Sequence, residues 1–579
     1  MTPGKPILAV QNLSVDFSTE EGLVHAVRHV DLELFPGKTH GLVGESGSGK
    51  SVTALAVMRL LSRSVSMIRS GSVMFNHPEW GDTDLLAVSD KKMQHIRGNH
   101  ISMVFQEPMT SLNPVQRCGR QLTESLVIHG KATRHDARKR AVELFGEVRL
   151  PAPESIMHAW PHELSGGQKQ RVMIAMAMAC SPAVLIADEP TTALDVTVQK
   201  SILELMQHLQ GQHNMAVLFI SHDLGIIHEV ADTASVMRYG SVVETGSVRD
   251  LFNNPGHPYT KALVACRPRL DERPEKLATV GDFLTEKKET DAPATNANTV
   301  RGPHPWQLSS KTEKPLLEVR GLHTHFITKR NFWGRPVEYH KAVNDISFEV
   351  YPGETLGLVG ESGCGKTTLG RSIMRLIQSR SGQVIYNGRD LATLSERELR
   401  KFRPKFQIIF QDPYASLTPG ISIGNAILEP MQVHGILQNT QARKRRISEL
   451  LERVGLEAAH YYRYPHEFSG GQRQRICIAR ALILDPDFIV CDESVSALDV
   501  SVQAQVLNLL NELKTDFGLT YVFISHDLSV VKYMSDRVMV MQHGRMVELA
   551  DADTIYANPQ NVHTRELIQA IPGSIDKVK

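Results

Sequence analysis

Short apolar runs recur along the chain and predict buried β-strands. Each run covers about five residues and ends at a polar residue, which is typical of parallel strands that are covered on both faces. The tightest runs are residues 183–188, 217–221, 488–492 and 521–525, and two longer ones are 7–17 and 26–35. Helical periodicity lies between them, for example in residues 196–210. This alternation predicts an α/β fold built on a parallel sheet.

The same pattern occurs twice. GLVGESGSGKS at residues 41–51 returns as GLVGESGCGKT at 357–367, and SGGQKQRVMIAMA at 165–177 returns as SGGQRQRICIARA at 469–481. From the second motif onward the two copies keep a constant spacing of 304 positions, as between Asp188 and Asp492. The chain is therefore a tandem duplication, with length differences confined to loops upstream.

A polar segment rich in Pro, Asn and Thr separates the copies. Its sequence includes ETDAPATNANTVRGPHPW and has few apolar side chains, which is typical of a flexible linker. We therefore predict a first domain at residues 1–269, a linker at 270–315 and a second domain at 316–579.

Composition excludes several classes of protein. Lys and Arg number 64 and Asp and Glu 63, so the net charge offers no broad attraction for nucleic acid. The six cysteines form no CxxC pair, which argues against a zinc module or a disulfide framework. No apolar run reaches the length of about 18 residues that spans a membrane, and the start of the chain lacks the pattern of a signal peptide. We expect such a chain to serve a membrane only by docking to it.

Two glycine-rich loops have the spacing of a P-loop. In such a loop, backbone N–H groups surround the phosphates, a lysine neutralises their charge, and the hydroxyl that follows coordinates Mg²⁺. Each loop stands directly before a helical pattern, as a P-loop requires. The predicted nucleotide-binding residues are Gly44, Ser46, Gly47, Gly49, Lys50 and Ser51 in the first copy, and Gly360, Ser362, Gly363, Gly365, Lys366, Thr367 and Thr368 in the second.

Each copy also has two adjacent carboxylates at the end of an apolar strand. Asp188 and Asp492 are placed to hold the metal, and Glu189 and Glu493 follow them directly. A carboxylate next to the metal suits a general base that orients water for attack on the γ-phosphate. An acidic turn after a strand would be the alternative, but the P-loop in each copy favours the catalytic interpretation.

The pentapeptides LSGGQ and FSGGQ stand just before helical segments, where serine and glycine N–H groups can bind an anion. They resemble the signature of the ABC ATPases, whose nucleotide domains pair so that the signature of one closes over ATP held by the P-loop of the other. The signature residues are Ser165, Gly166, Gly167, Gln168, Ser469, Gly470, Gly471 and Gln472. The resemblance implies a pseudo-dimer within one chain, in which Ser165–Gln168 serve the site of Lys366, and Ser469–Gln472 that of Lys50.

The resemblance assigns further roles. Gln106 and Gln411 match the glutamine that senses Mg²⁺ and the attacking water, and His222 and His526 match the histidine that contacts the γ-phosphate. Phe17 and Phe326 stand where the family has an aromatic residue that stacks on adenine, with core packing as the alternative. The family fold is a tandem P-loop NTPase whose domains each combine a RecA-like parallel sheet, an antiparallel β subdomain and a helical signature subdomain. Its cofactors are ATP and Mg²⁺.

Within the family, the chain is similar to ATPases of dipeptide and oligopeptide importers. The segments that show this similarity are QEPMTSLNP, QDPYASLTP, DEPTTALDVTVQ and NPGHPYTKAL. Joined pairs of this kind are known for glutathione importers, which residues 171–196 resemble, and as a second choice for a microcin and peptide importer. The resemblance implies two membrane permease subunits, an extracytoplasmic solute-binding protein, no nucleic acid, and a peripheral position on the cytoplasmic face of the plasma membrane.

The alternative function is a soluble tandem ABC ATPase of the translation-factor or DNA-repair type. The missing zinc-binding cysteine modules and the short, weakly charged linker argue against it. Two departures mark the second copy. Ser494 replaces the proline that usually follows the glutamate, and Cys364 replaces Ser48 of the first copy, which suggests sensitivity to thiol reagents.

Overall fold

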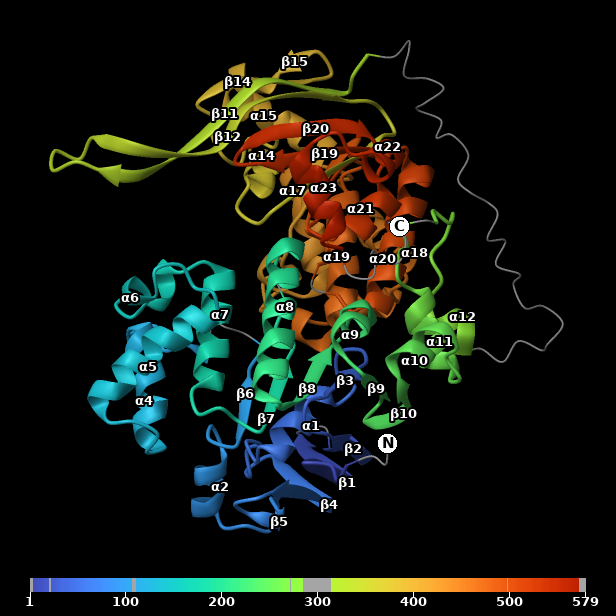
Figure 1. Cartoon of the computed structure of the whole chain (residues 1–579). Coiled ribbons are helices and arrows are strands. Elements are labelled where there is room, and N and C mark those ends of the chain that lie inside the picture. The colour runs from blue at the N-terminus through green and yellow to red at the C-terminus, as the bar shows by residue number, and fades with distance from the viewer. Residues whose placement is uncertain are drawn as a thin grey trace. The chain divides into compact units, whose positions relative to one another are not determined.

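The computed structural model describes residues 4–19, 22–106, 111–192, 194–270, 272–284, 314–496 and 498–571. Contacts divide the chain into two compact units (Figure 1). The first unit runs to Val264, and the second starts at Ala265 and also includes Asp195–Thr197. The domain boundaries given above stay a prediction. Among the described residues, no helix is long and apolar enough to cross a membrane.

The first unit contains a six-stranded, mainly parallel sheet. Its strands are β3 (Thr39–Val43), β6 (Ile101–Val104), β7 (Val184–Asp188), β8 (Ala216–Ser221), β9 (Thr233–Arg238) and β10 (Ser241–Ser247). Their order is β10-β9-β3-β8-β7-β6, with only β10 antiparallel to its neighbour. The predicted strands at 183–188 and 217–221 are confirmed as β7 and β8.

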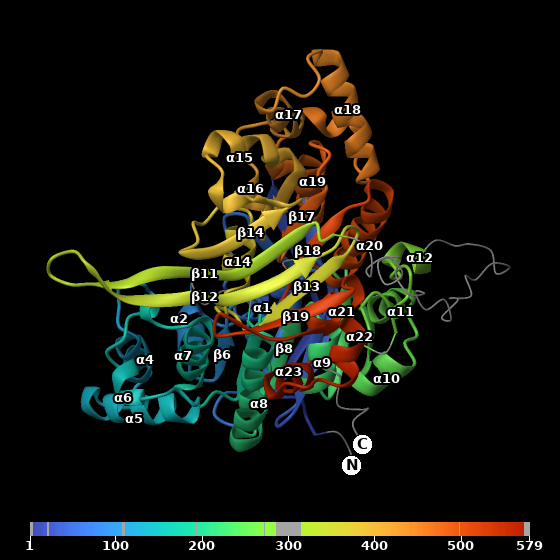
Figure 2. The same ribbon diagram turned by 90° about the horizontal axis from the view of Figure 1, so that it is seen from above.

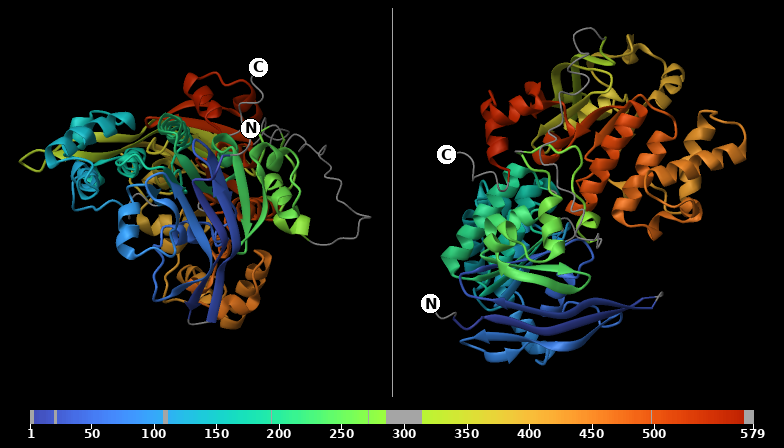
Figure 3. Two further views of the ribbon diagram at one scale, coloured as in Figure 1. Left: turned by 60° about the horizontal axis from the view of Figure 1, so that its bottom comes forward. Right: turned by 90° about the vertical axis from the view of Figure 1, so that its right-hand side faces the viewer.

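A four-stranded antiparallel sheet forms a separate layer of this unit, seen in blue at the bottom of the right panel of Figure 3. It consists of β1 (Leu8–Thr19), β2 (Gly22–Leu34), β4 (Ser66–His77) and β5 (Gly81–Asp84). The helix α1 (Lys50–Val57) shares one hydrophobic core with both sheets, in which Val15, Ala54 and Ile186 are fully buried. The antiparallel β subdomain implied by the family is therefore present.

The helices of the first unit complete the α/β fold. A helical part consists of α4 (Cys118–Ile128), α5 (Arg134–Glu147), α6 (Pro153–Ile156), η1 (Pro161–Glu163) and α7 (Gly166–Met178). The others are α2 (Asp90–Ile96), α8 (Val196–His213), α9 (Leu224–Val230), α10 (Val248–Asn253) and α11 (Pro258–Ala265). The periodicity of residues 196–210 correctly predicted α8.

The second unit repeats this plan. Its large sheet has the strands β13 (Thr355–Gly360), β16 (Phe406–Ile409), β17 (Phe488–Asp492), β18 (Thr520–Ile524), β19 (Arg537–Gln542) and β20 (Arg545–Asp551), in the order β16-β17-β18-β13-β19-β20. Its antiparallel sheet consists of β11 (Leu317–Arg330), β12 (Pro336–Val350), β14 (Ser381–Tyr386) and β15 (Arg389–Asp390). The predicted strands at 488–492 and 521–525 are confirmed as β17 and β18.

Its helices fall into the same groups. Those next to the nucleotide loop and the small sheet are α14 (Lys366–Ile373), η2 (Leu391–Thr393), α15 (Glu396–Phe402) and η3 (Arg403–Lys405). The helical part has α16 (Pro413–Ser416), α17 (Ile423–Val433), α18 (Thr440–Arg453), η4 (Ala458–Tyr462), η5 (Pro465–Glu467) and α19 (Gly470–Leu482). The remaining helices are α20 (Val500–Phe517), α21 (Leu528–Met534), α22 (Ala552–Ala557) and α23 (Val562–Gln569). Separate cores therefore cover the two faces of the sheet, one around α14 and one around α19, α20 and α21.

The hairpin of β11 and β12 projects far from the body of the second unit (Figures 1 and 2). At its tip, Phe332 is 97% and Trp333 82% exposed, and Asn331 holds the turn by accepting hydrogen bonds from the N–H groups of Trp333 and Arg335. In the first unit, β1 and β2 already pair at Thr19 and Gly22. The longer spacing upstream of the second P-loop is partly explained by this extended hairpin.

Residues 272–284 fold with the second unit. The side chain of Asn508, on α20, accepts a hydrogen bond from the N–H of Leu277 at 2.9 Å and donates one to its carbonyl at 2.8 Å. Arg273 donates to the carbonyls of Tyr533 and Ser535, and the segment continues into α12 (Val280–Leu284). Of the predicted flexible linker, residues 271 and 285–313 lie outside the described residues. Its described N-terminal part is hydrogen-bonded to the second unit.

We expect Asn508→Ala to release this segment. The change leaves two buried backbone groups of Leu277 without partners, at a cost of about 1–3 kcal/mol, and a difference of 1.4 kcal/mol changes a local opening equilibrium about tenfold. Hydrogen exchange followed by mass spectrometry should show at least about tenfold faster exchange in a peptide that covers residues 272–284. The exposed Asn253→Ala is the control. Unchanged protection in Asn508→Ala would show that the segment is held by other contacts.

Candidate nucleotide sites

The predicted catalytic residues of the first unit lie along one edge of its parallel sheet. Parallel strands end on the same side, and this edge is where open α/β sheets bind ligands. Strand β3 leads into Lys50, β8 into His222, β7 into Asp188 and Glu189, and β6 into Gln106. The strand order β3-β8-β7-β6 therefore sets the order of these side chains along the edge.

The P-loop joins β3 to α1 in a tight turn. Gly49 has φ of 101°, and a Cβ at this position would lie 2.5 Å from the carbonyl oxygen of Ala26. Both facts require glycine. The ammonium of Lys50 folds back and donates hydrogen bonds to the carbonyls of Gly44 at 2.7 Å and Glu45 at 2.8 Å. It thus lies within the loop formed by Gly44, Ser46 and Gly47, as a phosphate-binding lysine should.

Ser51 and Asp188 meet at the start of α1. The hydroxyl of Ser51 donates to Oδ1 of Asp188 at 3.0 Å, and Asp188 is only 5% exposed. Burial raises the pKa of Asp188 to about 6, because the hydrogen bond from Ser51 only partly offsets the loss of water. A hydroxyl beside a buried carboxylate that is poorly compensated is a donor set that fits Mg²⁺.

Glu189 is surrounded by donors. Its Oε2 accepts hydrogen bonds from Nε2 of Gln106 at 3.0 Å and from the hydroxyl of Thr192 at 2.9 Å, and it lies 3.2 Å from Nδ1 of His222. Its φ of 47° lies in the left-handed region, which turns the side chain away from the path of the strand. The structure therefore brings Gln106, Glu189 and His222 together. Sequence reasoning missed Thr192, although it stands in the same DEPTT motif.

The two adjacent carboxylates are shifted in opposite directions. Burial alone would raise the pKa of Glu189, but the hydrogen bond and positive charge of His222, helped by Thr192 and Lys50, lower it to about 2. For Asp188, the hydrogen bond from Ser51 and the charge of Lys50 only partly offset burial, and the negative charge of Glu189 adds to it, so burial prevails there. At the end of β7, the burial of Asp188 is therefore not fully offset by its neighbours, whereas that of Glu189 is more than offset.

The second unit builds the same site. Lys366 donates to the carbonyls of Gly360 at 2.7 Å and Glu361 at 2.9 Å, in the loop that also contains Ser362, Gly363 and Gly365. The hydroxyl of Thr367, which precedes Thr368, donates to Oδ1 of Asp492 at 2.9 Å. Oε2 of Glu493 accepts from Nε2 of Gln411 at 2.8 Å and lies 3.4 Å from Nδ1 of His526. Oδ2 of Asp492 is buried and accepts no hydrogen bond from the residues that the structure describes, so a metal ligand is available here too.

The pKa values of the second carboxylate pair are shifted in the same directions as those of the first pair. Burial raises the pKa of Asp492. Burial also acts to raise the pKa of Glu493, but the hydrogen bond and charge of His526 reverse this and lower it. Burial would lower the pKa of His526, and Glu493 raises it instead. Ser496, which stands where the first unit has Thr192, makes no side-chain hydrogen bond among the described residues.

Two further differences separate the units. Arg371 places its guanidinium 3.6 Å from Oδ2 of Asp492, whereas Leu55 stands at the same position of α1. Cys364 is 6% exposed, and burial raises the pKa of its thiol, which makes the thiol a poor nucleophile. The sensitivity to thiol reagents expected from the sequence is therefore not supported. Ser494 is buried, and nothing in the structure shows an effect of it on the strand end.

The signature residues lie in the helical parts of the two units, at the N-termini of α7 and α19. Ser165 Oγ accepts from the N–H of Gln168 at 3.3 Å, while the side chain of Gln168 accepts from the N–H of Ser165 at 3.0 Å. Ser469 and Gln472 form the same reciprocal cap on α19. The glycines between them, Gly166, Gly167, Gly470 and Gly471, open the first helical turn. Each helix thus begins with N–H groups that can bind an anion.

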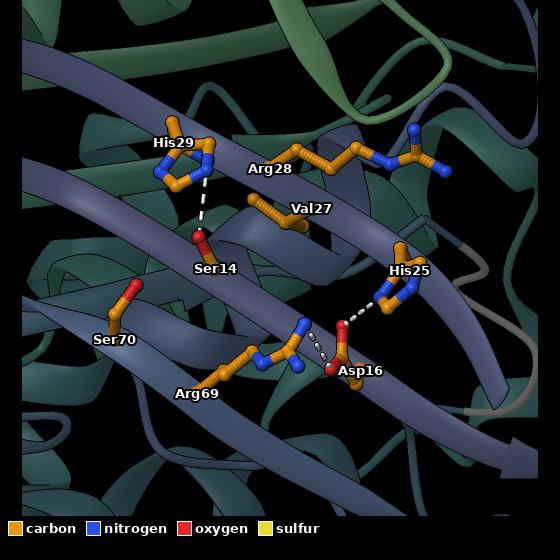
Figure 4. Close-up of a pocket in the computed structure, with 8 residues that line it drawn as sticks. All are labelled: Ser14, Asp16, His25, Val27, Arg28, His29, Arg69 and Ser70. Atoms are coloured by element: carbon orange, nitrogen blue, oxygen red, sulfur yellow. Dashed lines mark hydrogen bonds and ion pairs between the residues drawn. The ribbon is translucent and has the colours of Figure 1, made fainter.

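The aromatic residues proposed for adenine lie in the antiparallel sheets, apart from the catalytic groups. Phe17, on β1, is partly buried against the core, and Phe326, on β11, is 41% exposed. The packing alternative therefore fits Phe17 better than Phe326. A cavity of about 460 Å³ in the first of these sheets contains none of the predicted nucleotide residues (Figure 4). Its central Asp16 accepts a hydrogen bond from His25 at 2.7 Å and lies 3.6 Å from Arg69.

Neutral substitutions at the two carboxylates should change stability in opposite directions. The raised pKa of Asp188 means that its contribution is lost as pH rises through about 6, so Asp188→Asn should stabilise the nucleotide-free first unit by about 2 kcal/mol at pH 8. The lowered pKa of Glu189 gives stability that is present above about pH 4 and lost toward pH 2, so Glu189→Gln should destabilise it by about 2 kcal/mol at pH 8.

Both effects are measured by urea unfolding at pH 8 and pH 4 without Mg²⁺ or nucleotide. Hydrogen exchange in a peptide that covers β7 monitors the unfolding. The gain from Asp188→Asn should vanish at pH 4, where the wild-type carboxyl is protonated. Equal signs for the two variants at pH 8 would contradict the opposite shifts.

The comparisons with known proteins agree with this geometry. The ABC transporter family matches residues 27–192 and 343–496, and the family described as the oligopeptide/dipeptide transporter C-terminal region matches residues 243–292. A relative in Salmonella choleraesuis, strain SC-B67, named glutathione import ATP-binding protein GsiA, is 48% identical over 98% of this chain and 90% of its own length. The protein of the same name in Escherichia coli O6:H1 is 47% identical over 98% and 89%.

Solved structures are also similar in part. A dimeric ATP-binding cassette in a post-hydrolysis state with ADP and phosphate is 26% identical and covers 41% of this chain and 98% of its own, with a TM-score of 0.37. The family match covers more than half of the chain, and the curated relatives extend the similarity over nearly all of it. The chain belongs to the ABC transporter family and carries two of its ATP-binding cassettes.

Proposed function

We propose that this chain is the ATP-hydrolysing subunit of an importer for peptides, with glutathione as the candidate cargo. The observation that carries the proposal is the complete set of a P-loop lysine, a hydroxyl–aspartate pair and a Gln–Glu–His cluster in each unit. The match of residues 243–292 to the oligopeptide/dipeptide transporter region and the import function in the relatives' names support the cargo class.

The same reasoning supports the partners. An ATPase subunit of an importer needs a path through the membrane, and no described helix provides one. We therefore infer two membrane permease subunits, reached through the segments that follow Gln106 and Gln411, and a solute-binding protein on the far side. The chain would act peripherally on the cytoplasmic face, and this inference rests on the family and on the relatives' names.

ATP binding would begin at the P-loops. The Lys50 ammonium now uses carbonyls of its own loop, and phosphate oxygens would replace them as partners that carry charge. Ser51 and Asp188, or Thr367 and Asp492, would hold Mg²⁺, which neutralises charge on the phosphates. Asp188, whose burial is poorly compensated at neutral pH, gains most from that ion.

Hydrolysis needs a base at Glu189. The low pKa of Glu189 depends on the hydrogen bond and charge of His222, so the carboxylate is a weak base while that contact lasts. If His222 turns to the γ-phosphate, the remaining burial raises the proton affinity of Glu189. A water held by Gln106 would then transfer a proton to Oε2 of Glu189 as its oxygen bonds to the γ-phosphorus, and the bond from phosphorus to the bridging oxygen would break, with ADP as the leaving group. Glu493, His526 and Gln411 would act in the same way.

We further propose that each site is completed by the other half's signature. Ser165–Gln168 would serve ATP on Lys366, and Ser469–Gln472 would serve ATP on Lys50. This proposal rests on the family, in which nucleotide domains pair in this way. Joining both halves in one chain would raise their effective concentration. Phe17 and Phe326 stay the proposed adenine contacts, and the exposed Phe326 is the better placed of the two.

Replacing the bases should stop turnover while ATP stays bound. Glu189→Gln and Glu493→Gln keep the shape of the side chain but remove the proton acceptor, and loss of a general base lowers kcat by about 100-fold or more. We expect each single variant to lose most ATPase activity with the permease present, and the double variant to retain unhydrolysed ATP. Steady-state phosphate release and analysis of the retained nucleotide measure this. Full transport-coupled turnover in either single variant would contradict two working sites.

Paired substitutions test which signature serves which P-loop. If the sites are composite, Lys50→Ala with Ser469→Ala disables one site, whereas Lys50→Ala with Ser165→Ala disables both. The first pair should therefore bind about one equivalent of ATP tightly in the Glu493→Gln background, and the second pair none. Equilibrium dialysis with labelled ATP counts the sites. The reverse result would mean that each half completes its own site.

The soluble alternative can be separated by copurification. The relatives reported above carry an importer's name, so the comparisons give no support to a translation or repair factor. Recovery of the chain with two membrane proteins from detergent extracts supports the proposed function. Recovery with ribosomes or DNA from the soluble fraction would overturn it.

A further inference from the structure

The turn between β4 and β5 is an insertion relative to its counterpart in the second unit. Phe75 and Tyr386 are equivalent, because they pair with Leu8 and Leu317 at the starts of β1 and β11. Phe75 then pairs across the turn with Thr83, eight positions later, whereas Tyr386 pairs with Arg389, three positions later. The first unit therefore has five additional residues in this turn.

The additional residues carry three functional side chains that converge on His100, just before β6. Trp80 donates a hydrogen bond from its indole Nε1 to Nε2 of His100 at 3.0 Å, and Glu79 Oε2 lies 3.4 Å from the same nitrogen. The rings of His77 and His100 have centroids 4.6 Å apart. His100 is 7% exposed, while Glu79 is exposed to solvent. The cluster therefore has a fixed, buried member and a movable, solvent-facing one.

We propose that His77, Glu79 and His100 bind one divalent transition-metal ion, with Zn²⁺ as the best fit. One ligand atom from each side chain lies within 4.8 Å of the others, and no second group of three such side chains occurs in the part of the chain that the structure describes. Imidazole and carboxylate ligands suit Zn²⁺, which binds them at about 2.0–2.2 Å. The three ligand atoms must move closer to one another to surround one ion at these metal–ligand distances. The exposed side chain of Glu79 allows this movement.

The metal would compete with Trp80. An indole N–H is only a donor, so Nε2 of His100 carries a lone pair that Trp80 now uses, and the amide nitrogen of Asn99 lies 3.2 Å from the same atom. Glu79 Oε2 cannot donate to that nitrogen either, because a carboxylate only accepts. Two acceptor atoms 3.4 Å apart favour a cation between them. Zn²⁺ would take the lone pair of His100 and bring Glu79 with it, and Trp80 would lose one neutral hydrogen bond.

The position of the cluster predicts a structural effect. The carbonyl of His100 accepts the N–H groups of Ala183 and Val184 at 2.9 and 3.1 Å, at the start of β7. The nucleotide residues lie at the opposite ends of β6 and β7. Bound metal would therefore tie the antiparallel sheet to the parallel sheet without contacting ATP.

In the second unit, an ion pair and a hydrogen bond connect the residues equivalent to His100 and Ala183. The carbonyl of Lys405 accepts the N–H of Asp487, as that of His100 accepts the N–H of Ala183. The Lys405 ammonium lies 3.1 Å from Asp487 Oδ1, and the hydroxyl of Tyr386 donates to Asp487 Oδ2 at 3.2 Å. An ion pair there corresponds to the histidine cluster in the first unit, so only the first unit should bind the metal.

Zinc titration of the full chain tests the proposal. The protein is prepared without a histidine tag, stripped with a chelator, and titrated with Zn²⁺ against a chromophoric competitor in excess Mg²⁺ and without nucleotide. We expect His77→Gln and Glu79→Gln to weaken one zinc site per chain by at least about tenfold. We also expect Zn²⁺ to slow hydrogen exchange of the β4–β5 turn in the wild type but not in His77→Gln or Glu79→Gln. The exposed His135→Gln, on α5, controls for surface histidines.

Trp80→Phe gives the sharpest distinction, because it removes the shorter of the two donor contacts to Nε2 of His100, leaves that of Asn99, and keeps an aromatic ring. If the metal takes the lone pair of His100, this variant should bind Zn²⁺ more tightly than the wild type by several-fold. Unchanged zinc affinity in Trp80→Phe, or in His77→Gln and Glu79→Gln, would overturn the proposal and leave a metal-free Trp–His contact. ATP hydrolysis is not a readout here, so the result is independent of the proposed transport function.

Discussion

The position of every proposed catalytic group depends on one constraint, the order of parallel strands in each large sheet. Residues far apart in sequence, such as Lys50 and Glu189, meet because β3 and β7 end on the same side with β8 between them. The strand between them ends at His222, so the histidine is placed next to the glutamate that it neutralises. A change that shifted one strand by a residue would move its side chain to the other face and break the cluster.

Two neighbouring carboxylates on one strand end would repel each other, and the structure separates their behaviour by environment. Glu189 is turned by its left-handed backbone toward Gln106, Thr192 and His222, which supply hydrogen bonds and charge. Asp188 stays in line with β7, where the hydroxyl of Ser51 and the charge of Lys50 do not offset its burial. In the nucleotide-free protein the burial of Asp188, the proposed metal ligand, is thus not fully offset, while the histidine lowers the proton affinity of Glu189, the proposed base. Both conditions would change in the same event, when ATP and Mg²⁺ enter.

Much of this was predictable from sequence. The duplication, the strands that end at Asp188 and Asp492, and the P-loop glycines depend on local patterns that only one fold satisfies. The direction of each pKa shift was not predictable, because it depends on how deeply the strand end is buried and on which donors surround it. The contact of Asn508 with Leu277 was not predictable either, because nothing in the sequence around Leu277 indicates a buried partner. The contacts of His100 were not predictable from the sequence, because its neighbours come from an inserted turn.

The comparison of the two copies also changes where asymmetry should be sought. The sequence pointed to Ser494 and Cys364, yet Cys364 is buried beside Lys366 with a thiol whose pKa is raised. The larger electrostatic difference is Arg371, whose guanidinium lies 3.6 Å from Oδ2 of Asp492, at the position where the first unit has Leu55. A guanidinium there partly supplies the positive charge that Mg²⁺ would bring, so the second site has less to gain from the ion than the first. The two sites should therefore differ in how strongly they depend on Mg²⁺, although their catalytic residues are identical.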